Sequence, residues 1–148
     1  MKKILLLLFC GLVATSAVRA QDYNWGVGLR PGIVATGITV KGFIGGANAL
    51  EGILSFVDGV NFYGLYERNV PLNGKGLNFY YGAGGNIGNW EKKKKDKFTV
   101  GIDGVMGIEY KVDGVPIVFG IDYKPAINLI GHDGFIWDDF GLHVRVVF

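Results

Sequence analysis

The sequence predicts an all-β fold: an eight-stranded antiparallel up-and-down transmembrane β-barrel. Short segments in which apolar and polar residues alternate recur along the chain, and turn dipeptides separate them. Alternation with a period of two is typical of strands whose two faces meet different surroundings. In most segments large apolar residues occupy one face, whereas glycine and charged residues of both signs occupy the other. No segment shows a convincing helical periodicity.

The first 20 residues have the composition of a secretory signal peptide. Two lysines precede an apolar run, 4–13, which small residues follow as far as Ala20. Cleavage after Ala20 would leave small residues at the two positions that such signals require. A membrane-spanning helix is the alternative, but the 15 residues 4–18 fall short of the roughly 20 that a span needs. We therefore expect residues 1–20 to be a cleaved, Sec-type signal peptide and residues 21–148 to form the barrel domain.

Removing this segment changes the composition. Three of the 15 basic residues lie in it, which leaves 12 basic and 13 acidic residues and a formal charge of −1, a balance that does not suggest nucleic-acid binding. The only cysteine, Cys10, also lies there, so no disulfide or cysteine metal site is expected. Glycine supplies 24 of the remaining 128 residues, which is more than twice the usual roughly 7%. Because these glycines stand among β-branched and aromatic residues, they indicate a crowded interior rather than a disordered linker.

Seven connections divide the barrel domain into eight predicted strands. Four are the turn dipeptides Asp58-Gly59, Asn73-Gly74, Asp113-Gly114 and Asp133-Gly134. The other three are Pro31-Gly32, Gly45-Gly46 and the charged run 91–97. The predicted strands are 23–31, 37–44, 49–57, 60–70, 77–90, 98–112, 116–130 and 136–148. An even number places both chain ends on one side of the membrane, as in bacterial outer-membrane barrels.

The first strands differ in how clearly they alternate. The first places Tyr23, Trp25, Val27 and Leu29 on one face and Asn24, Gly26, Gly28 and Arg30 on the other. The third and fourth are the least regular, because the alternation is blurred over 59–67, where a β-bulge could exchange the two faces. The fifth places Leu77, Phe79, Tyr81 and Ala83 opposite Asn78, Tyr80, Gly82 and Gly84.

The last three strands alternate most clearly. The sixth opposes Phe98, Val100, Ile102, Met106 and Ile108 to Thr99, Asp103 and Glu109. The seventh opposes Ile117, Phe119, Ile121, Tyr123 and Ile127 to Gly120, Asp122, Lys124 and Asn128. The eighth opposes Leu142, Val144, Val146 and Phe148 to Gly141, His143, Arg145 and Val147.

The composition of the two faces predicts that the apolar face is the outer one. A soluble barrel directs apolar residues inward, but here the apolar faces carry too many large side chains for an eight-stranded interior, whose width its side chains just fill. The aromatic residues also fall into two belts, as at membrane interfaces. We expect one belt at the periplasmic rim (Tyr23, Trp25, Tyr66, Tyr110, Phe148) and one at the outer rim (Trp90, Phe98, Phe135, Trp137).

Several runs carry a family resemblance: Gly28-Leu29-Arg30-Pro31-Gly32, 48–54, 64–67, 80–85, 101–104 and Lys124-Pro125. With them the chain resembles small outer-membrane barrel proteins of the Bacteroidetes type, which are grouped with OmpX- and OmpA-like eight-stranded barrels or as "porin family" proteins. The resemblance implies a Gram-negative outer-membrane location, with outer-membrane lipid and lipopolysaccharide as neighbours and with periplasmic chaperones during biogenesis. The residues Val144, Val146 and Phe148 are similar to the C-terminal signal read by the barrel-assembly machinery, although His143 stands where that signal often has glycine.

Eight charged residues fall on the predicted inner faces: Arg30, Lys41, Glu51, Asp103, Glu109, Asp122, Lys124 and Arg145. Buried charges persist when they are paired and hydrogen-bonded, so we expect an interior salt-bridge network that plugs the lumen. Expected pairs are Arg145 with Asp122, and Lys124 with Glu109 or Asp103. The alternative is a pore whose lining charges select ions.

The remaining sequence features favour a structural or interaction role in the cell envelope over catalysis. We expect no catalytic, cofactor-binding or metal-binding residues. A dense run of lysines is either a solvated loop or a contact for lipopolysaccharide phosphates. It consists of Lys92, Lys93, Lys94, Lys95 and Lys97. A narrow porin-like channel is the alternative function, followed by a soluble periplasmic lipocalin-like barrel that binds a ligand.

Overall fold

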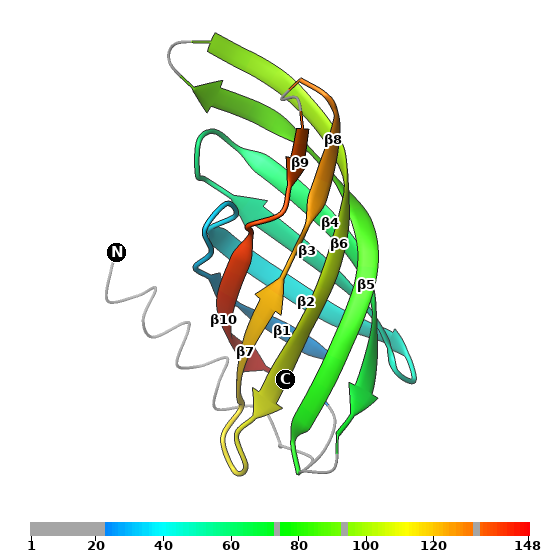
Figure 1. The fold of residues 1–148 in the computed structure, drawn as a ribbon. Helices are drawn as coiled ribbons and strands as arrows, with labels where there is room; N and C mark the ends of the chain where they lie inside the picture. The colour runs from blue at the N-terminus through cyan, green and yellow to red at the C-terminus, as the bar shows by residue number, and fades with distance from the viewer. Residues whose placement is uncertain (1–22, 73–74, 93–94, 132–133) are drawn as a thin grey trace, which may run out of the picture.

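The computed structural model describes residues 23–72, 75–92, 95–131 and 134–148, and these form a β-barrel (Figure 1). The strands are β1 (Trp25–Arg30), β2 (Gly37–Gly45), β3 (Asn48–Ser55), β4 (Asn61–Pro71), β5 (Leu77–Lys92), β6 (Lys95–Lys111), β7 (Ile117–Tyr123), β8 (Ala126–Ile130), β9 (Gly134–Ile136) and β10 (Phe140–Val147). The described residues include no helix of the length and apolar character that a membrane span requires.

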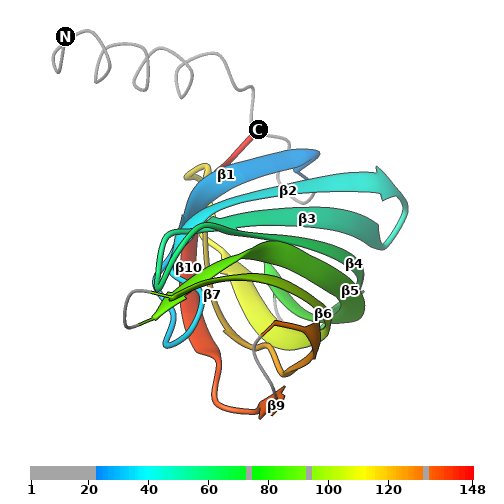
Figure 2. The same cartoon turned by 90° about the horizontal axis from the view of Figure 1, so that it is seen from above.

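The ten strands form eight segments that each run from one end of the barrel to the other, as the sequence predicts. Each such segment is called here a stave. Each of β1 to β6 pairs antiparallel with the next along the chain. The seventh stave is β7 followed by β8, both paired with β6, and the eighth is β9 followed by β10. Pairing of β10 with β1 closes the ring, which Figure 2 shows from above.

The last two staves are interrupted, so the continuous strands expected at 116–130 and 136–148 are wrong in this detail. The seventh breaks at Lys124-Pro125, because proline has no backbone N–H to donate to a ladder. The N–H of Lys124 instead donates to the carbonyl of Asp139, at 2.8 Å. The segment 137–139 correspondingly separates β9 from β10.

The charged run 91–97 is another correction, because it was expected to connect two strands. Both strands continue into it: β5 extends to Lys92 and β6 starts at Lys95, with Glu91 opposite Asp96. No glycine or proline in this run interrupts the pairing. The resulting β5–β6 hairpin projects beyond the rest of the barrel (Figure 1).

The bulge considered for residues 59–67 is absent from β4, which alternates cleanly. Register shifts lie instead in β2, between Phe43 and Gly45, and in β6, between Val100 and Gly101. The expected turns at 45–46, 58–59 and 113–114 are confirmed, and each contains residues with positive φ. The dipeptides at 73–74 and 133–134 fall wholly or partly outside the described residues.

The two ends of the barrel differ. The start of β1, the end of β10 and the turns 45–48, 71–77 and 111–117 lie at one end, called here the terminal end. The connections that follow β1, β3, β5 and β8 lie at the opposite end, called here the far end. Both described chain ends therefore share a side, as an even number of staves requires.

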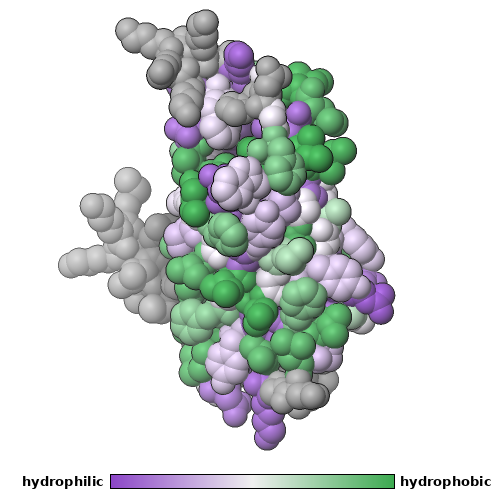
Figure 3. Space-filling model, in the orientation of Figure 1, coloured by the Kyte–Doolittle hydropathy of each residue, from purple (hydrophilic) through white to green (hydrophobic). Residues whose placement is uncertain are grey.

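The outward positions of the strands are apolar. The exposed large apolar side chains on the strands have exposed fractions between 37% for Val27 and 63% for Leu29, and Figure 3 shows many apolar residues over the face that contains β5 to β7 and β10. Inside, one small apolar cluster includes Ile53, Tyr63 and Leu65, and charged and polar side chains fill much of the remainder.

Tyr23 is a correction to the outward set. Its side chain is buried, and its hydroxyl donates to Glu109 Oε1 at 2.9 Å. The backbone N–H groups of Asn24 and Trp25 both donate to the carbonyl of Phe148, so two residues oppose one. This bulge-like pairing shifts the alternation before β1, and Tyr23 turns inward while Trp25 remains outward.

Candidate functional site

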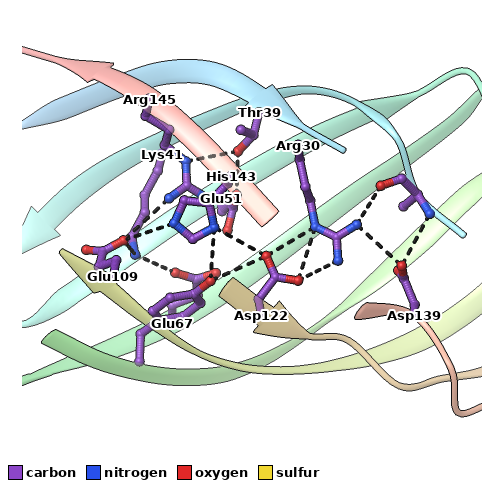
Figure 4. A network of polar contacts seen from close by, with 12 residues as sticks. Arg30, Thr39, Lys41, Glu51, Glu67, Glu109, Asp122, Asp139, His143 and Arg145 are labelled. Carbon is purple, nitrogen blue, oxygen red and sulfur yellow. Dashed lines mark hydrogen bonds and ion pairs between the residues drawn. The ribbon is translucent and has the colours of Figure 1, made fainter. Parts of the chain in front are cut away.

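All eight charged residues that the sequence predicts to face inward are buried in the barrel. Each has an exposed fraction of 7% or less. Two further acidic residues, Glu67 and Asp139, and the histidine His143 are buried with them. Figure 4 shows most of these side chains converging within the lumen from opposite walls. The candidate site is this network, which has two layers along the barrel.

The layer nearer the far end is built around two cations, Arg30 and Lys124. Arg30 forms an ion pair with Asp122, and its Nη1 atom also donates to the carbonyl of Ala35 at 2.5 Å. The Nζ atom of Lys124 lies 3.0 Å from Asp139 Oδ2 and 3.3 Å from Asp103 Oδ1. Asp139 Oδ1 lies 3.4 Å from Arg30 Nη1, so this carboxylate joins the two cations.

Asp139 also holds the connection between β1 and β2. Its Oδ1 atom accepts from the backbone N–H groups of Val34, at 3.2 Å, and Ala35, at 3.4 Å. These bonds replace strand pairing beyond the first residue of β10, because β9 pairs with β8 and is not a neighbour of β1. The charge network and the closure of the barrel wall therefore depend on the same side chain.

The layer nearer the terminal end contains Lys41, Arg145 and three glutamates. Arg145 donates to Glu51 through Nη2 and to Glu109 Oε2 through Nη1, the latter at 3.4 Å. Lys41 Nζ lies 3.1 Å from Glu109 Oε2 and 2.9 Å from Glu67 Oε2. The contact with Glu67 is an ion pair without hydrogen-bond geometry.

Polar side chains complete this layer. Thr39 donates to Glu51 and accepts from Arg145 Nε at 3.3 Å. Asn69 accepts from Lys41 Nζ at 3.0 Å. Buried charges are stable only when they are paired and hydrogen-bonded in this way.

His143 and Tyr80 lie between the two layers. The Nδ1 atom of His143 is 3.4 Å from Asp122 Oδ2, and its Nε2 atom is 3.9 Å from Glu109 Oε2. The Tyr80 hydroxyl lies 3.5 Å from both Asp122 Oδ2 and His143 Nδ1. Lys41 also lies 4.2 Å from the centroid of the Tyr80 ring, a cation–π contact.

Glycine provides the space for these large side chains. A Cβ atom on Gly120 would lie 2.2 Å from His143 Nε2, and one on Gly107 would lie 2.6 Å from the Tyr80 hydroxyl. Glycine inside strands marks close approach of this kind. The high glycine content of the chain therefore follows in part from the size of its buried polar residues.

The expected ion pairs are partly right. The pair between Lys124 and Asp103 is confirmed, and the second partner of Lys124 is Asp139 rather than Glu109. The expected pair between Arg145 and Asp122 is wrong. Arg145 is opposite Val118 in the β7–β10 register, whereas Asp122 is opposite Gly141, so four residues separate them along the strand.

Sequence reasoning omitted three members of the network for different reasons. Glu67 shares its inward face with the apolar residues Tyr63 and Leu65, which obscures the alternation of β4. Asp139 lies in the irregular segment before β10, where no periodicity applies. His143 was already assigned to the inner face, so the signal that could have included it was present.

Two hollows border the network. The first, about 720 Å³, opens at the terminal end and is lined by Tyr23, Asn69 and Lys111, among others. The second lies between the network and the far end beside Asn86 and Lys124, and at about 10 Å³ it has room for about one water molecule. Among the described residues, the network lies between these hollows.

The other predicted contact residues that the structure describes lie on β5, β6 and the last stave. Lys92 and Lys95 are at the ends of β5 and β6, Lys97 is exposed, and Lys93 and Lys94 lie outside the described residues. Val144, Val146 and Phe148 share the outward face of the last stave. Within the described part of the chain, no group of three or more histidine, cysteine, aspartate or glutamate residues is placed to hold a metal ion.

Comparisons with family models, curated proteins and solved structures find no match to this chain. The eight-stranded closed barrel therefore rests on the structure itself. The likeness to OmpX- and OmpA-like proteins rests on the sequence runs quoted above.

Proposed function

We propose that the protein is an outer-membrane β-barrel with a non-catalytic, structural or interaction role in the cell envelope, and that its charge network closes the lumen. The observation that carries this proposal is the reversal of the usual distribution of residues. Charged side chains such as Arg30 and Arg145 are fully buried, whereas Ile102, Ile121 and Leu142 are more than half exposed.

The dimensions of the apolar surface support the membrane assignment. On β6 the outward positions between Phe98 and Tyr110 carry apolar side chains, apart from Gly104. At about 3.3 Å per residue and a strand tilt of about 40°, this stretch covers about 30 Å along the barrel axis. The hydrocarbon core of a bilayer has about this thickness.

The interior supports a closed lumen and disfavours a lipocalin-like role. A ligand-binding soluble barrel presents an apolar cavity, but here Lys41, Arg145 and their partners occupy the centre. Arg30 and Lys124 are buried in the same interior. The interior of an eight-stranded barrel is only wide enough for side chains to fill.

Membrane extraction and gel mobility test the location. The full chain is expressed with its N-terminal segment, the outer membrane is isolated, and samples are run with and without boiling. We expect the protein in the outer-membrane fraction, with faster migration before boiling, as a folded membrane barrel gives. A protein in the soluble periplasmic fraction whose mobility does not change on boiling would overturn the proposal.

A narrow channel is the second candidate, and the hollow at the terminal end favours it. A hollow of about 720 Å³ has room for water and ions beside the network. The described network also has six carboxylates for four lysine or arginine side chains, a balance that would favour cations. Recording from the purified protein in planar bilayers separates the candidates, because reproducible conductance steps would contradict the closed lumen.

Two partner assignments complete the proposal. Lys92, at the end of β5, and Lys95 and Lys97, at the start of β6, lie toward the far end, which faces outward if the chain ends are periplasmic. The ammonium groups of the lysine run suit lipopolysaccharide phosphates. Replacing all five with glutamine should reduce association with lipopolysaccharide, and unchanged association would remove this assignment. Val144, Val146 and Phe148 are the proposed recognition element for the barrel-assembly machinery, so Phe148→Ala should lower the assembled fraction more than Phe56→Ala, an exposed phenylalanine in the β3–β4 connection.

A further inference from the structure

A groove crosses the outer surface of the barrel between two rows of apolar side chains. One row is formed by Ile33, Phe140, Tyr123 and Met106, which are neighbours across the 31–33 segment, β10, β7 and β6. The other is formed by Leu142, Ile121, Ile108 and Phe79, neighbours across β10, β7, β6 and β5. The groove has a volume of about 720 Å³ and an almost entirely apolar lining.

The floor of the groove lacks side chains. Gly32, Gly141, Asp122 and Gly107 are neighbours across the same strands. Three of these four residues are glycines, and the Asp122 carboxylate turns inward to Arg30. Aromatic rings form part of one wall: those of Tyr123 and Phe140 pack against each other with centroids 4.7 Å apart. The face that contains these strands is the one toward the viewer in Figure 3.

The groove is inclined relative to the barrel axis. Phe79 lies two residues from the terminal end of β5, Ile108 three from that of β6, Ile121 four from that of β7 and Leu142 five from that of β10. The groove therefore starts near the terminal end beside β5 and rises toward Ile33. If the chain ends are periplasmic, the part of the groove between Phe79 and Leu142 lies in the half of the membrane nearer the periplasm, and Ile33, in the connection after β1, is its limit toward the far end.

The length of the groove fits one hydrocarbon chain. It crosses four intervals between neighbouring strands, which at about 4.8 Å each gives about 19 Å. Because strands tilt by about 40° from the axis, a path across them covers about 12 Å of depth. Half of a bilayer core is about 15 Å thick, so an inclined acyl chain would extend through most of one leaflet.

We propose that this groove binds one acyl chain of a glycerophospholipid from the periplasmic leaflet. This inference rests on the proposed membrane location, and it adds that one lipid is held at a defined place rather than exchanged evenly around the barrel. The head group lies near the turns at the terminal end, beside Phe79, and the chain extends across β6 and β7 toward Phe140. Burial of apolar surface on both sides of the chain supplies the binding energy.

Photolabelling from the lipid tests this proposal. The purified full barrel domain is reconstituted in vesicles of phosphatidylethanolamine and phosphatidylglycerol, with a small fraction of phosphatidylethanolamine carrying a diazirine on one acyl chain. After illumination, mass spectrometry locates the labelled residues. We expect labelling of Ile121, Tyr123 and Phe140 to exceed that of Ile102 and Ile127 several-fold.

A pair of matched variants identifies the groove as the cause. Ile121→Trp fills the groove, whereas Ile102→Trp adds the same ring at an outward position on β6 outside it; the two isoleucines are 57% and 55% exposed. Ile121→Trp should remove the excess labelling at Tyr123 and Phe140, and Ile102→Trp should retain it. Mobility before and after boiling shows that both variants are folded.

The outcomes separate this inference from the proposed function. Even labelling around the apolar surface would overturn the inference and leave the membrane location supported. An unlabelled groove in a cross-linked dimer, with labelling elsewhere, would assign the groove to a second copy and also overturn it. A protein that stays outside the vesicles and takes no label would overturn both.

Discussion

Arg30 on β1 and Asp122 on β7 form a two-point ion pair across an intervening stave. The Nε atom of Arg30 lies 3.2 Å from both carboxylate oxygens, and its Nη2 atom lies 2.5 Å from Oδ1. β10 lies between these strands, and its Gly141 leaves the path open, because a Cβ atom there would be 2.6 Å from the Cζ atom of Arg30. The pair therefore depends on a glycine in a strand that contributes neither charge.

Removing the charge of Asp122 should destabilise the barrel strongly. In Asp122→Asn the shape of the side chain is nearly retained, but Arg30 keeps only the more distant Asp139, 3.4 Å away, as an anionic partner. Leaving a buried charge without its partner costs about 3–5 kcal/mol. Urea unfolding of the protein in lipid vesicles, followed by tryptophan fluorescence, measures this loss.

The control for this substitution is Asp113→Asn, an exposed aspartate in the turn between β6 and β7. Surface changes of this kind shift stability by about 0.5 kcal/mol or less. Equal effects of the two substitutions would mean that the buried pair contributes no more than a surface charge.

A methyl group at Gly141 should act on the same ion pair. In Gly141→Ala the new Cβ meets the guanidinium of Arg30, which Asp122 and Ala35 hold in place, so either the side chain or β10 must move. Overpacking of this kind typically costs about 1–3 kcal/mol. Gly104→Ala is the matched control, because its nearest atom would be Pro125 Cγ at 3.6 Å, an ordinary contact. Unfolding midpoints that fall equally in both variants would contradict the crossing inferred for Arg30.

The inward position of the eight charged residues could be predicted because alternation along a strand is local. Once Asp103 and Glu109 are assigned to one face of β6, a period of two settles their side of the sheet. The partners could not be predicted in the same way. They depend on how far each stave is displaced relative to the next, and this displacement places Arg145 beside Glu51 and Glu109 rather than beside Asp122.

The irregular positions explain the other differences. Pro125 interrupts a stave that the alternation on its two sides suggests is continuous, and the displaced segment turns Asp139 inward. Tyr23 turns inward because two N–H groups share the carbonyl of Phe148, a pairing that no local pattern reveals. Long-range hydrogen bonds determine the positions of Asp139 and Tyr23, and a single strand does not encode them. The break at Pro125 has a local cause, which the regular alternation on its two sides conceals.

Removing the two buried arginines together should open the lumen. Arg30 and Arg145 belong to different layers of the network, so each single alanine variant keeps the other layer and should not conduct. In Arg30→Ala combined with Arg145→Ala, both layers lose their largest side chain, and the remaining carboxylates face an open path. Planar-bilayer recording should then show cation-selective conductance.

Arg68→Ala is the control for this variant, because Arg68 points outward from β4. Its conductance should equal that of the unmodified protein. A double variant that still shifts mobility on boiling but does not conduct would contradict the assignment of the arginines as the closing groups.

A lysine on the outer surface tests which side of the barrel meets lipid. Ile102 lies near the middle of the apolar stretch of β6 and is 55% exposed. If this surface faces hydrocarbon, Ile102→Lys should destabilise the folded barrel in vesicles by about 2–4 kcal/mol, as a lysine near the bilayer midplane does. In a soluble barrel the same change would replace an exposed apolar side chain with a solvated one and would have almost no cost.

Val115→Lys is the matched control, because Val115 is exposed in the turn between β6 and β7, where water is expected under either arrangement. Urea unfolding in vesicles should therefore separate Ile102→Lys from Val115→Lys by at least about 2 kcal/mol, and equal stabilities would contradict the lipid-facing assignment of β6.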